Sequence, residues 1–237
     1  MPVSKITEPK PRRTTGASAG ARQKFPGAEA FFPKRRTLGT LREASKGCKG
    51  CDLYIAATQT VFGEGPSSAR VVFVGEQPGN HEDLQGRPFV GPAGGIFDRA
   101  LAEAGIARDE VYVTNAVKHF SFEQRGKARL HKRPRPGEIR ACAPWLREEL
   151  AQIEPEVVVL LGSTAAQSIF GTTFRITAER GKKLESDLAP FVMATIHPSA
   201  VLRAPDDASR KQSFQSLVDD LRLVARELER KPARRAD

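Results

Sequence analysis

Four short apolar segments, separated by segments with helical periodicity, restrict the folds open to this chain more than any other feature. A short apolar run bounded by turn residues is typical of a strand buried on both faces. Such strands alternating with helices form a parallel sheet with helices on each side. We therefore predict a three-layer α/β/α sandwich with a central four-stranded, mainly parallel sheet. The predicted strands are residues 70–75, 111–115, 157–162 and 191–197, and the predicted helices are residues 95–104, 138–153, 164–170 and 211–229.

The distribution of charge separates a basic N-terminal segment from the rest of the chain. The formal net charge is +10, and residues 1–36 hold nine Lys and Arg against two Asp and Glu, so they supply +7 of it. Their composition is rich in Pro, Gly, Ser and Thr. We predict a basic disordered tail over residues 1–36, one domain over residues 37–230 and a basic C-terminal tail over residues 231–237. A basic chain suits a polyanionic partner, although a solvated tail explains the charge equally well.

The sequence gives no sign of a membrane segment or an export signal. No segment approaches the roughly 20 consecutive apolar residues that a membrane span needs, and the N-terminus lacks the apolar core of a signal peptide. We therefore expect no membrane partner and a cytoplasmic location, in the cytosol or nucleoid of a bacterium. The odd number of cysteines, three, argues against a disulfide framework.

Two of the cysteines are spaced as a pair, Cys48-x-x-Cys51, and Cys142 lies at the start of a predicted helix. In a reducing compartment, cysteines so placed indicate a metal site or redox chemistry. A fourth ligand would be needed, and His119 and His131 are the candidates. Both Zn²⁺ and an iron–sulfur cluster suit such a ligand set. The alternative is a redox-active cysteine pair with Cys142 as an inert core residue.

A loop rich in glycine and proline, residues 75–95, follows the first predicted strand. A connection between a strand and a helix commonly has about 2–6 residues, so a structural crossover does not account for its length. Glu76 ends the first predicted strand, Asn115 the second and His197 the fourth. The carboxyl ends of parallel strands meet at one edge of the sheet. We therefore expect a carboxylate, an amide and an imidazole in one cleft, which is the inventory of a catalytic site.

Residues 119–137 interrupt the alternation of strands and helices. The stretch is basic and contains proline, and its apolar residues show no periodicity. Loops of this length in a compact domain are usually functional or disordered.

Several spaced motifs resemble the family 4 uracil-DNA glycosylases, over about residues 38–228. Residues 75–79, 82–83, 86, 88–91 and 93–94 resemble the family's first motif, and residues 197–199 resemble its second motif. The three cysteines match three of the four that hold the family's 4Fe-4S cluster. The resemblance implies a uracil-DNA glycosylase fold, uracil-containing DNA as the partner, and a 4Fe-4S cluster held by Cys48, Cys51, His119 and Cys142.

The resemblance also implies roles in base excision for the residues of the predicted cleft. Phe89 would stack on the flipped base, Asn115 would hydrogen-bond the edge of the base, and Gln77 would bind substrate. His197 would stabilise the negative charge that grows on uracil. Glu76 would stabilise positive charge on the sugar or orient the attacking group.

Two departures from the family 4 pattern are similar to the UdgX subgroup, whose members stay covalently attached to the DNA they act on. His119 replaces the fourth cysteine, and a basic loop, residues 126–131, ends in a histidine. This likeness implies that His131 attacks C1′ of the sugar, with Glu76 hydrogen-bonded to its ring. Arg129 would position the loop through a carboxylate or a DNA phosphate. Ala128 departs from an all-basic run. We expect a single-turnover monomer that favours single-stranded DNA.

Three alternative functions are compatible with parts of the sequence. One is a conventional family 4 glycosylase that turns over, with His131 binding phosphate. Another is a non-catalytic protein that binds uracil-containing DNA. The third is a nucleotide-binding α/β protein with a zinc site, which is disfavoured because neither G-x-x-x-x-G-K-[ST] nor G-x-G-x-x-G follows a predicted strand.

Overall fold

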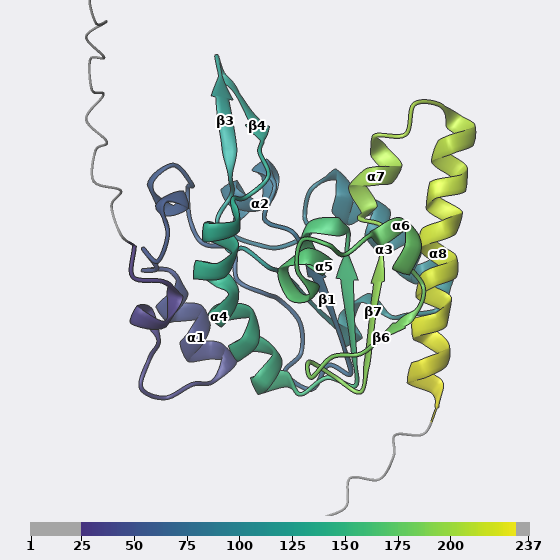
Figure 1. The fold of residues 1–237 in the computed structure, drawn as a ribbon, viewed down its shortest axis with the longest axis horizontal. Helices are drawn as coiled ribbons and strands as arrows, with labels where there is room; N and C mark the ends of the chain where they lie inside the picture. Colours follow the sequence, from purple (N-terminus) through teal and green to yellow (C-terminus); the bar gives the residue numbers. More distant parts are fainter. Residues whose placement is uncertain (1–24, 231–237) are drawn as a thin grey trace, which may run out of the picture.

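The computed structural model describes residues 25–230 (Figure 1). The predicted disorder of the N-terminal tail falls largely on residues 1–24, which lie outside the described residues, as does the predicted C-terminal tail at 231–237. Residues 25–36 contact the domain. Ala28 is fully buried, the Gly27 N–H donates to the Gly50 carbonyl at 3.0 Å, and the ring centroids of Phe32 and Trp145 lie 4.7 Å apart. Packing therefore begins ahead of residue 37.

Within residues 25–230 the central sheet has five strands, in the order β2-β1-β5-β7-β6. The four predicted strands are all present and parallel: β1 (Val71–Gly75), β2 (Val111–Asn115), β5 (Val157–Leu161) and β7 (Phe191–Thr195). The predicted strand number was wrong by one. The fifth strand, β6 (Lys183–Leu184), has two residues and pairs antiparallel to β7 at the edge, so it is too short to leave a periodic pattern.

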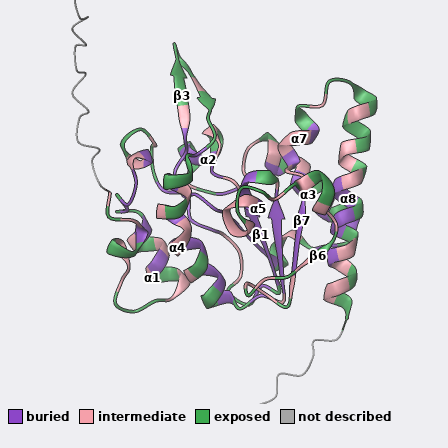
Figure 2. Cartoon of the chain, viewed as in Figure 1, coloured by how far each residue is buried: buried purple, intermediate pink, exposed green. Residues whose placement is uncertain are grey.

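Helices cover both faces of the sheet, which confirms the predicted three layers. Helices α3 (Pro92–Ala104) and α8 (Asp207–Glu229) pack on one face, and α4 (Pro136–Ile153) and α5 (Ser163–Phe170) pack on the other. Alternate strand residues belong to the two cores because successive side chains point to opposite faces. The strands are consequently buried along their length (Figure 2).

The strand order defines where a ligand site is expected. From β1 the chain crosses to β2 on one side, whereas β5 pairs with the other side of β1. The loops that leave the carboxyl ends of β1 and β5 therefore diverge. Open α/β sheets bind ligands in the crevice at such a switch point.

The interpretation of residues 119–137 as lacking regular structure was wrong, because an antiparallel hairpin occupies part of this stretch. Strands β3 (Phe122–Arg125) and β4 (Ala128–His131) pair with one another and with no other strand of the described chain. The hairpin projects from the domain (Figure 1). Most of its residues are exposed on both faces, so its sequence has no alternation of polar and apolar positions from which to predict it.

The 75–95 loop is also more regular than predicted, because it contains the short helix α2 (Asn80–Gln85).

No helix within residues 25–230 is long and apolar enough to cross a membrane. The other elements are the short helices η1 (Ala28–Phe31), α1 (Leu38–Ser45), η2 (Asp52–Ile55), η3 (Arg108–Glu110), α6 (Ile176–Glu179) and α7 (Pro198–Leu202).

Candidate active site

A cavity of about 470 Å³ lies at the carboxyl edge of the sheet, beside the switch point. Its volume is in the range of pockets that bind small ligands. The loops after β1, β5 and β7 and the end of β4 all contribute to its wall. The predicted catalytic and substrate-binding residues, apart from Arg129, line it: Glu76, Gln77, Phe89, Asn115, His131 and His197.

The side-chain amide of Gln77 holds the base of the β3–β4 hairpin. Its Oε1 accepts from the Ser121 N–H at 2.8 Å, which fixes the orientation of the amide because a backbone N–H only donates. Its Nε2 donates to the Ser121 carbonyl at 3.1 Å and to the Lys132 carbonyl at 3.0 Å, on opposite legs of the hairpin. Gln77 therefore couples the loop after β1 to the hairpin. Its predicted contact with substrate stays a prediction.

The imidazole of His131 contacts the same amide. His131 Nε2 lies 2.9 Å from Gln77 Nε2. An amide nitrogen only donates, so His131 Nε2 is a third acceptor of this NH₂ group beside the two carbonyls, and a neutral ring then carries its proton on Nδ1. The unprotonated nitrogen is the nucleophilic one, and it becomes available when the contact with Gln77 opens. The His131 side chain is 51% exposed, so a large ligand can reach it.

Glu76 lies near His131 without bonding to it. Glu76 Oε1 is 3.9 Å from His131 Nε2, which is too long for a hydrogen bond. The hydrogen bond expected between these side chains is absent, and Gln77 contacts the ring instead. Glu76 Oε1 is buried and has no hydrogen-bond partner among the described residues. Burial of an unpartnered carboxylate oxygen is costly, so a donor or a positive charge from a ligand is favoured at this position.

Arg129 stabilises the hairpin against the 75–95 loop. Its Nη1 donates to Asp83 Oδ2 at 2.7 Å and its Nε donates to Asn80 Oδ1 at 2.7 Å. The guanidinium also lies over two rings, 5.6 Å from the centroid of Phe120 and 5.1 Å from that of Phe122. Of the two partners expected for Arg129, a carboxylate is the one present. Because Arg129 and His131 are two residues apart on one strand, these contacts orient the face that carries His131.

His197 both caps helix α7 and lines the cavity. The Ser199 N–H donates to His197 Nδ1 at 3.1 Å, and Ser199 Oγ lies 2.7 Å from the same nitrogen. Nδ1 is therefore an acceptor, and the proton of the neutral ring is on Nε2. Burial, together with the positive charge of Arg203 and the neighbouring His131, lowers the pKa of His197 to about 4. At neutral pH the ring is uncharged, with one N–H available to donate.

Phe89 and Asn115 form the part of the wall next to the end of β1. The backbone of Phe89 has a φ of 58°, a costly conformation for a residue other than glycine, and its carbonyl leaves no room for a Cβ at Gly94. The Phe89 ring is stacked with that of His197, with centroids 6.4 Å apart. Asn115 is 3% exposed and lies at the end of β2. Strained backbone of this kind is frequent at ligand sites.

Gly75 is the position at which a small substitution would distort the wall most directly. A Cβ there would overlap Asn115 Oδ1 and lie 3.0 Å from Phe89 Cζ. We expect Gly75→Ala to lower the activity of the site about a hundredfold, since a displacement of about 1 Å has effects of this size. The control is Gly95→Ala on α3, where a Cβ meets nothing within 4 Å. Equal activities of the two variants, measured at equal folded fraction, would show that the wall is not used.

Glu82, a residue of the first motif, connects two parts of the 75–95 loop. Its Oε2 accepts from the Gly79 N–H at 3.0 Å and its Oε1 accepts from the Gly91 N–H at 2.7 Å. The carboxylate thus joins the two arms of the 75–95 loop, one arm carrying Glu76 and the other Phe89. A carboxylate three residues after a helix N-cap is the sequence signal for the first of these bonds.

The three cysteines are buried together on the side of the domain that holds α1 and the start of α4. Cys48, Cys51 and Cys142 belong to one core cluster with Trp145, and none is in a disulfide. The Trp145 Nε1–H donates to Cys48 Sγ at 3.3 Å, and the Lys118 N–H donates to Cys142 Sγ at 3.2 Å. N–H groups directed at sulfur are typical of thiolates that ligate iron.

The three cysteines and His119 are all buried, which is the environment of a buried metal site. No three His, Cys, Asp or Glu groups within residues 25–230 are grouped closely enough to hold one metal ion. Burial raises the pKa of Cys51 to about 11 and that of Cys142 to about 12, and it lowers the pKa of His119 to about 4. Thiols so placed ionise when a metal replaces the proton, and neutral histidine is the form that ligates.

The fold and the cavity define an α/β protein with a ligand site at the switch point of a parallel sheet. The model of the uracil DNA glycosylase superfamily matches residues 62–222. A type-4 uracil-DNA glycosylase of Thermotoga maritima is 36% identical over 198 residues, which cover 83% of this chain and 100% of the relative. A type-4 uracil-DNA glycosylase of Archaeoglobus fulgidus is 40% identical over 73% of this chain and 87% of the relative.

A type-5 uracil-DNA glycosylase of Pyrobaculum aerophilum is more distant, at 31% identity over 57% of this chain. The chain belongs to the uracil-DNA glycosylase superfamily and resembles its type-4 members.

Proposed function

We propose that the protein excises uracil from DNA and then stays bonded, through His131, to C1′ of the abasic sugar. Excision is the activity named for the type-4 relatives. The covalent step rests on one observation: His131 Nε2, which carries no proton when it accepts from Gln77, lies in the same cavity as the unpartnered oxygen of Glu76. The proposed domain is residues 37–230, with the packed residues before it as an extension.

Excision begins with a base that has left the helical stack, because the bond to be broken is not accessible inside a duplex. Phe89 offers an apolar π face to the base. Asn115 offers both a donor and an acceptor, which matches the edge of uracil. Single-stranded DNA presents such a base without the free-energy cost of unpairing, so it is the favoured substrate. We propose that the protein acts as a monomer in the cytoplasm.

The N-glycosidic bond then breaks, and its electron pair departs with uracil. His197 Nε2–H donates to the uracil oxygen on which negative charge grows. The sugar becomes positively charged, and the oxygen of Glu76 stabilises that charge. His131 Nε2 next donates its electron pair to C1′, which forms the new bond and moves the positive charge to the imidazole. The uracil anion takes a proton from solvent after release.

The cluster proposed for this chain would be held by Cys48, Cys51, His119 and Cys142. When bound, it would join the segment before β1, the turn after β2 and helix α4 into one unit. The protein as purified is expected to absorb visible light and to contain iron. A colourless protein that binds Zn²⁺ instead would contradict the proposal, because Zn²⁺ has a filled d shell and no redox chemistry.

The test of the covalent step uses single-stranded DNA with one uracil and a denaturing gel. We expect a slower band that survives SDS and heat, and no such band with thymine in place of uracil. Free abasic product without a slower band would establish the conventional, turning-over glycosylase. Retention of uracil-containing DNA only under native conditions, with the base intact, would establish a non-catalytic binding protein.

A further inference from the structure

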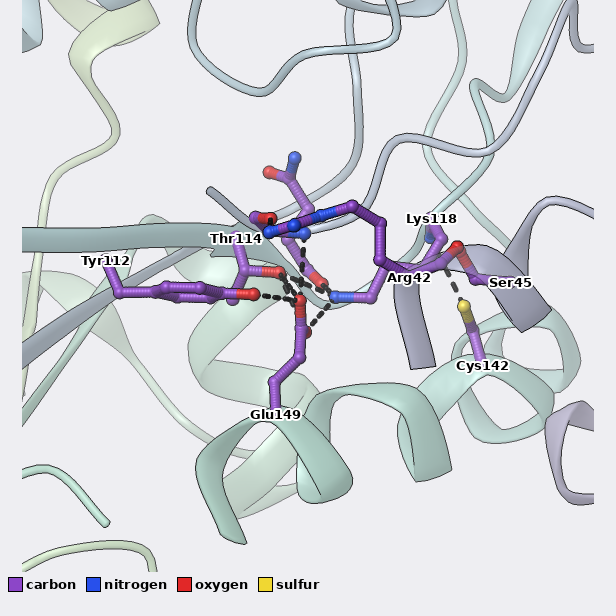
Figure 3. A network of polar contacts seen from close by, with 9 residues as sticks. Arg42, Ser45, Tyr112, Thr114, Lys118, Cys142 and Glu149 are labelled. Carbon is purple, nitrogen blue, oxygen red and sulfur yellow. Dashed lines mark hydrogen bonds and ion pairs between the residues drawn. The ribbon is translucent and has the colours of Figure 1, made fainter. Parts of the chain in front are cut away.

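A fully buried ion pair connects the candidate base pocket with the helix that carries Cys142. Lys118 Nζ and Glu149 Oε2 form the pair, and both side chains are 0% exposed. Glu149 Oε1 also accepts from Tyr112 OH at 3.0 Å and from the Gly63 N–H at 2.9 Å. Figure 3 shows Glu149 projecting from its helix toward Tyr112, Thr114 and Lys118. Both oxygens of this carboxylate therefore accept hydrogen bonds within the protein.

A gain in the free energy of unfolding does not explain why this ion pair is fully buried. Removing two charges from water costs more than their attraction commonly returns, and well-packed apolar residues are often at least as stabilising. The bonds of the Lys118 ammonium show what the pair provides. It donates to Thr114 Oγ1 at 2.6 Å and to the Asn115 carbonyl at 2.9 Å, the last two residues of β2.

The segment that follows β2 also supports the loop after β1. The Ala116 N–H donates to the Gly75 carbonyl at 2.9 Å, and the Val117 N–H donates to the Glu76 carbonyl at 3.0 Å. Lys118 ends this segment, so its ammonium fixes the turn from which both Asn115 and Glu76 are held. Glu149, on α4, anchors the ammonium. It lies on the same face of that helix as Cys142, which is seven residues earlier in the chain.

We propose that Lys118 and Glu149 are a positioning pair that sets the place of Asn115, and through it the place of the base, relative to helix α4. This inference rests on the proposed function, because it takes Asn115 as the group that contacts uracil. Neither charged side chain lines the cavity, and the pair acts through the Thr114 side chain and the Asn115 carbonyl at the end of β2.

The test removes both charges together, since one charge left alone in the interior is strongly destabilising. In Lys118→Met/Glu149→Gln, methionine replaces the lysine stem, and glutamine keeps an acceptor for Tyr112 and Gly63. A matched control, Arg70→Met/Glu156→Gln, makes the same kinds of change in an ion pair ahead of β1 and β5. The single-turnover rate of uracil excision is measured as a function of protein concentration. Thermal unfolding and visible absorbance are measured on the same variants.

We expect Lys118→Met/Glu149→Gln to fold and absorb light like the wild type and to excise uracil about ten- to a hundredfold more slowly at saturating protein. The control variant keeps the wild-type rate. Adding Asn115→Ala to the charge-free variant lowers the rate no further than Asn115→Ala alone, because the pair acts through that residue.

Two results separate failure of this inference from failure of the proposed function. If Asn115→Ala alone excises uracil at the wild-type rate, the pocket assignment fails, whatever the pair does. If Asn115→Ala is slow but the charge-free variant matches the wild type, or if the two effects multiply, the pair does not act through Asn115 and the proposal is overturned.

Discussion

His131→Ser is expected to form no covalent adduct with uracil-containing DNA and to release abasic product in its place. Serine has no imidazole nitrogen, and its hydroxyl is shorter and a weaker nucleophile, so the cationic sugar is left to water. Excision itself is expected to continue, because Asn115, His197 and Glu76 are unchanged. The substitution should therefore convert a protein that acts once into an enzyme that turns over.

The adduct is measured on a denaturing gel, and abasic sites are measured by cleavage in alkali. The matched control is Leu130→Ser, one residue earlier on β4 and 42% exposed, where adjacent side chains point to opposite faces. This variant is expected to keep forming the adduct. An adduct formed by His131→Ser at the wild-type yield would assign the covalent bond to another residue.

His197→Ala is expected to slow excision about 10²–10³-fold, the usual effect of removing one donor to a developing anion. The loss should appear in the rate at saturating protein rather than in DNA binding, because the charge on uracil develops only as the bond breaks. Ser199→Ala is the control. It removes one contact to His197 Nδ1 but keeps the backbone N–H that fixes the tautomer, so a smaller effect is expected.

The acidity of His197 adds a second measurement on the wild type. Its pKa is lowered to about 4, so the ring is neutral at every pH from about 5 to 8. Protonation of this ring is therefore expected to produce no step in the rate over that interval. A step that disappears in His197→Ala would mean that the imidazole enters the reaction as a cation.

The sequence was sufficient to predict the sheet and the convergence of Glu76, Asn115 and His197. Their positions depend on long apolar strands and on the geometry of parallel sheets, which both leave clear patterns. The hairpin could not be predicted, since its strands have four residues each and are largely exposed. Edge strand β6 is shorter still.

The contacts of charged and amide side chains were harder to predict than the fold. Lysine and glutamate are almost always exposed, so nothing in the sequence indicates that Lys118 and Glu149 are fully buried partners 31 residues apart. Gln77 was predicted to bind substrate because it lies in the first motif of the resemblance. Its contact with both legs of the hairpin depends on a tertiary arrangement that local patterns do not specify.

Within residues 25–230 the β3–β4 hairpin pairs with no other strand, and the side chains of Gln77 and Arg129 bind it to the domain. Under the proposed function, base recognition lies in the sheet edge, whereas the fate of the sugar lies in this appendage. Uracil recognition and covalent attachment therefore depend on different structural elements. A related glycosylase into which this hairpin is transferred would gain covalent attachment to DNA without any change to the residues that select uracil.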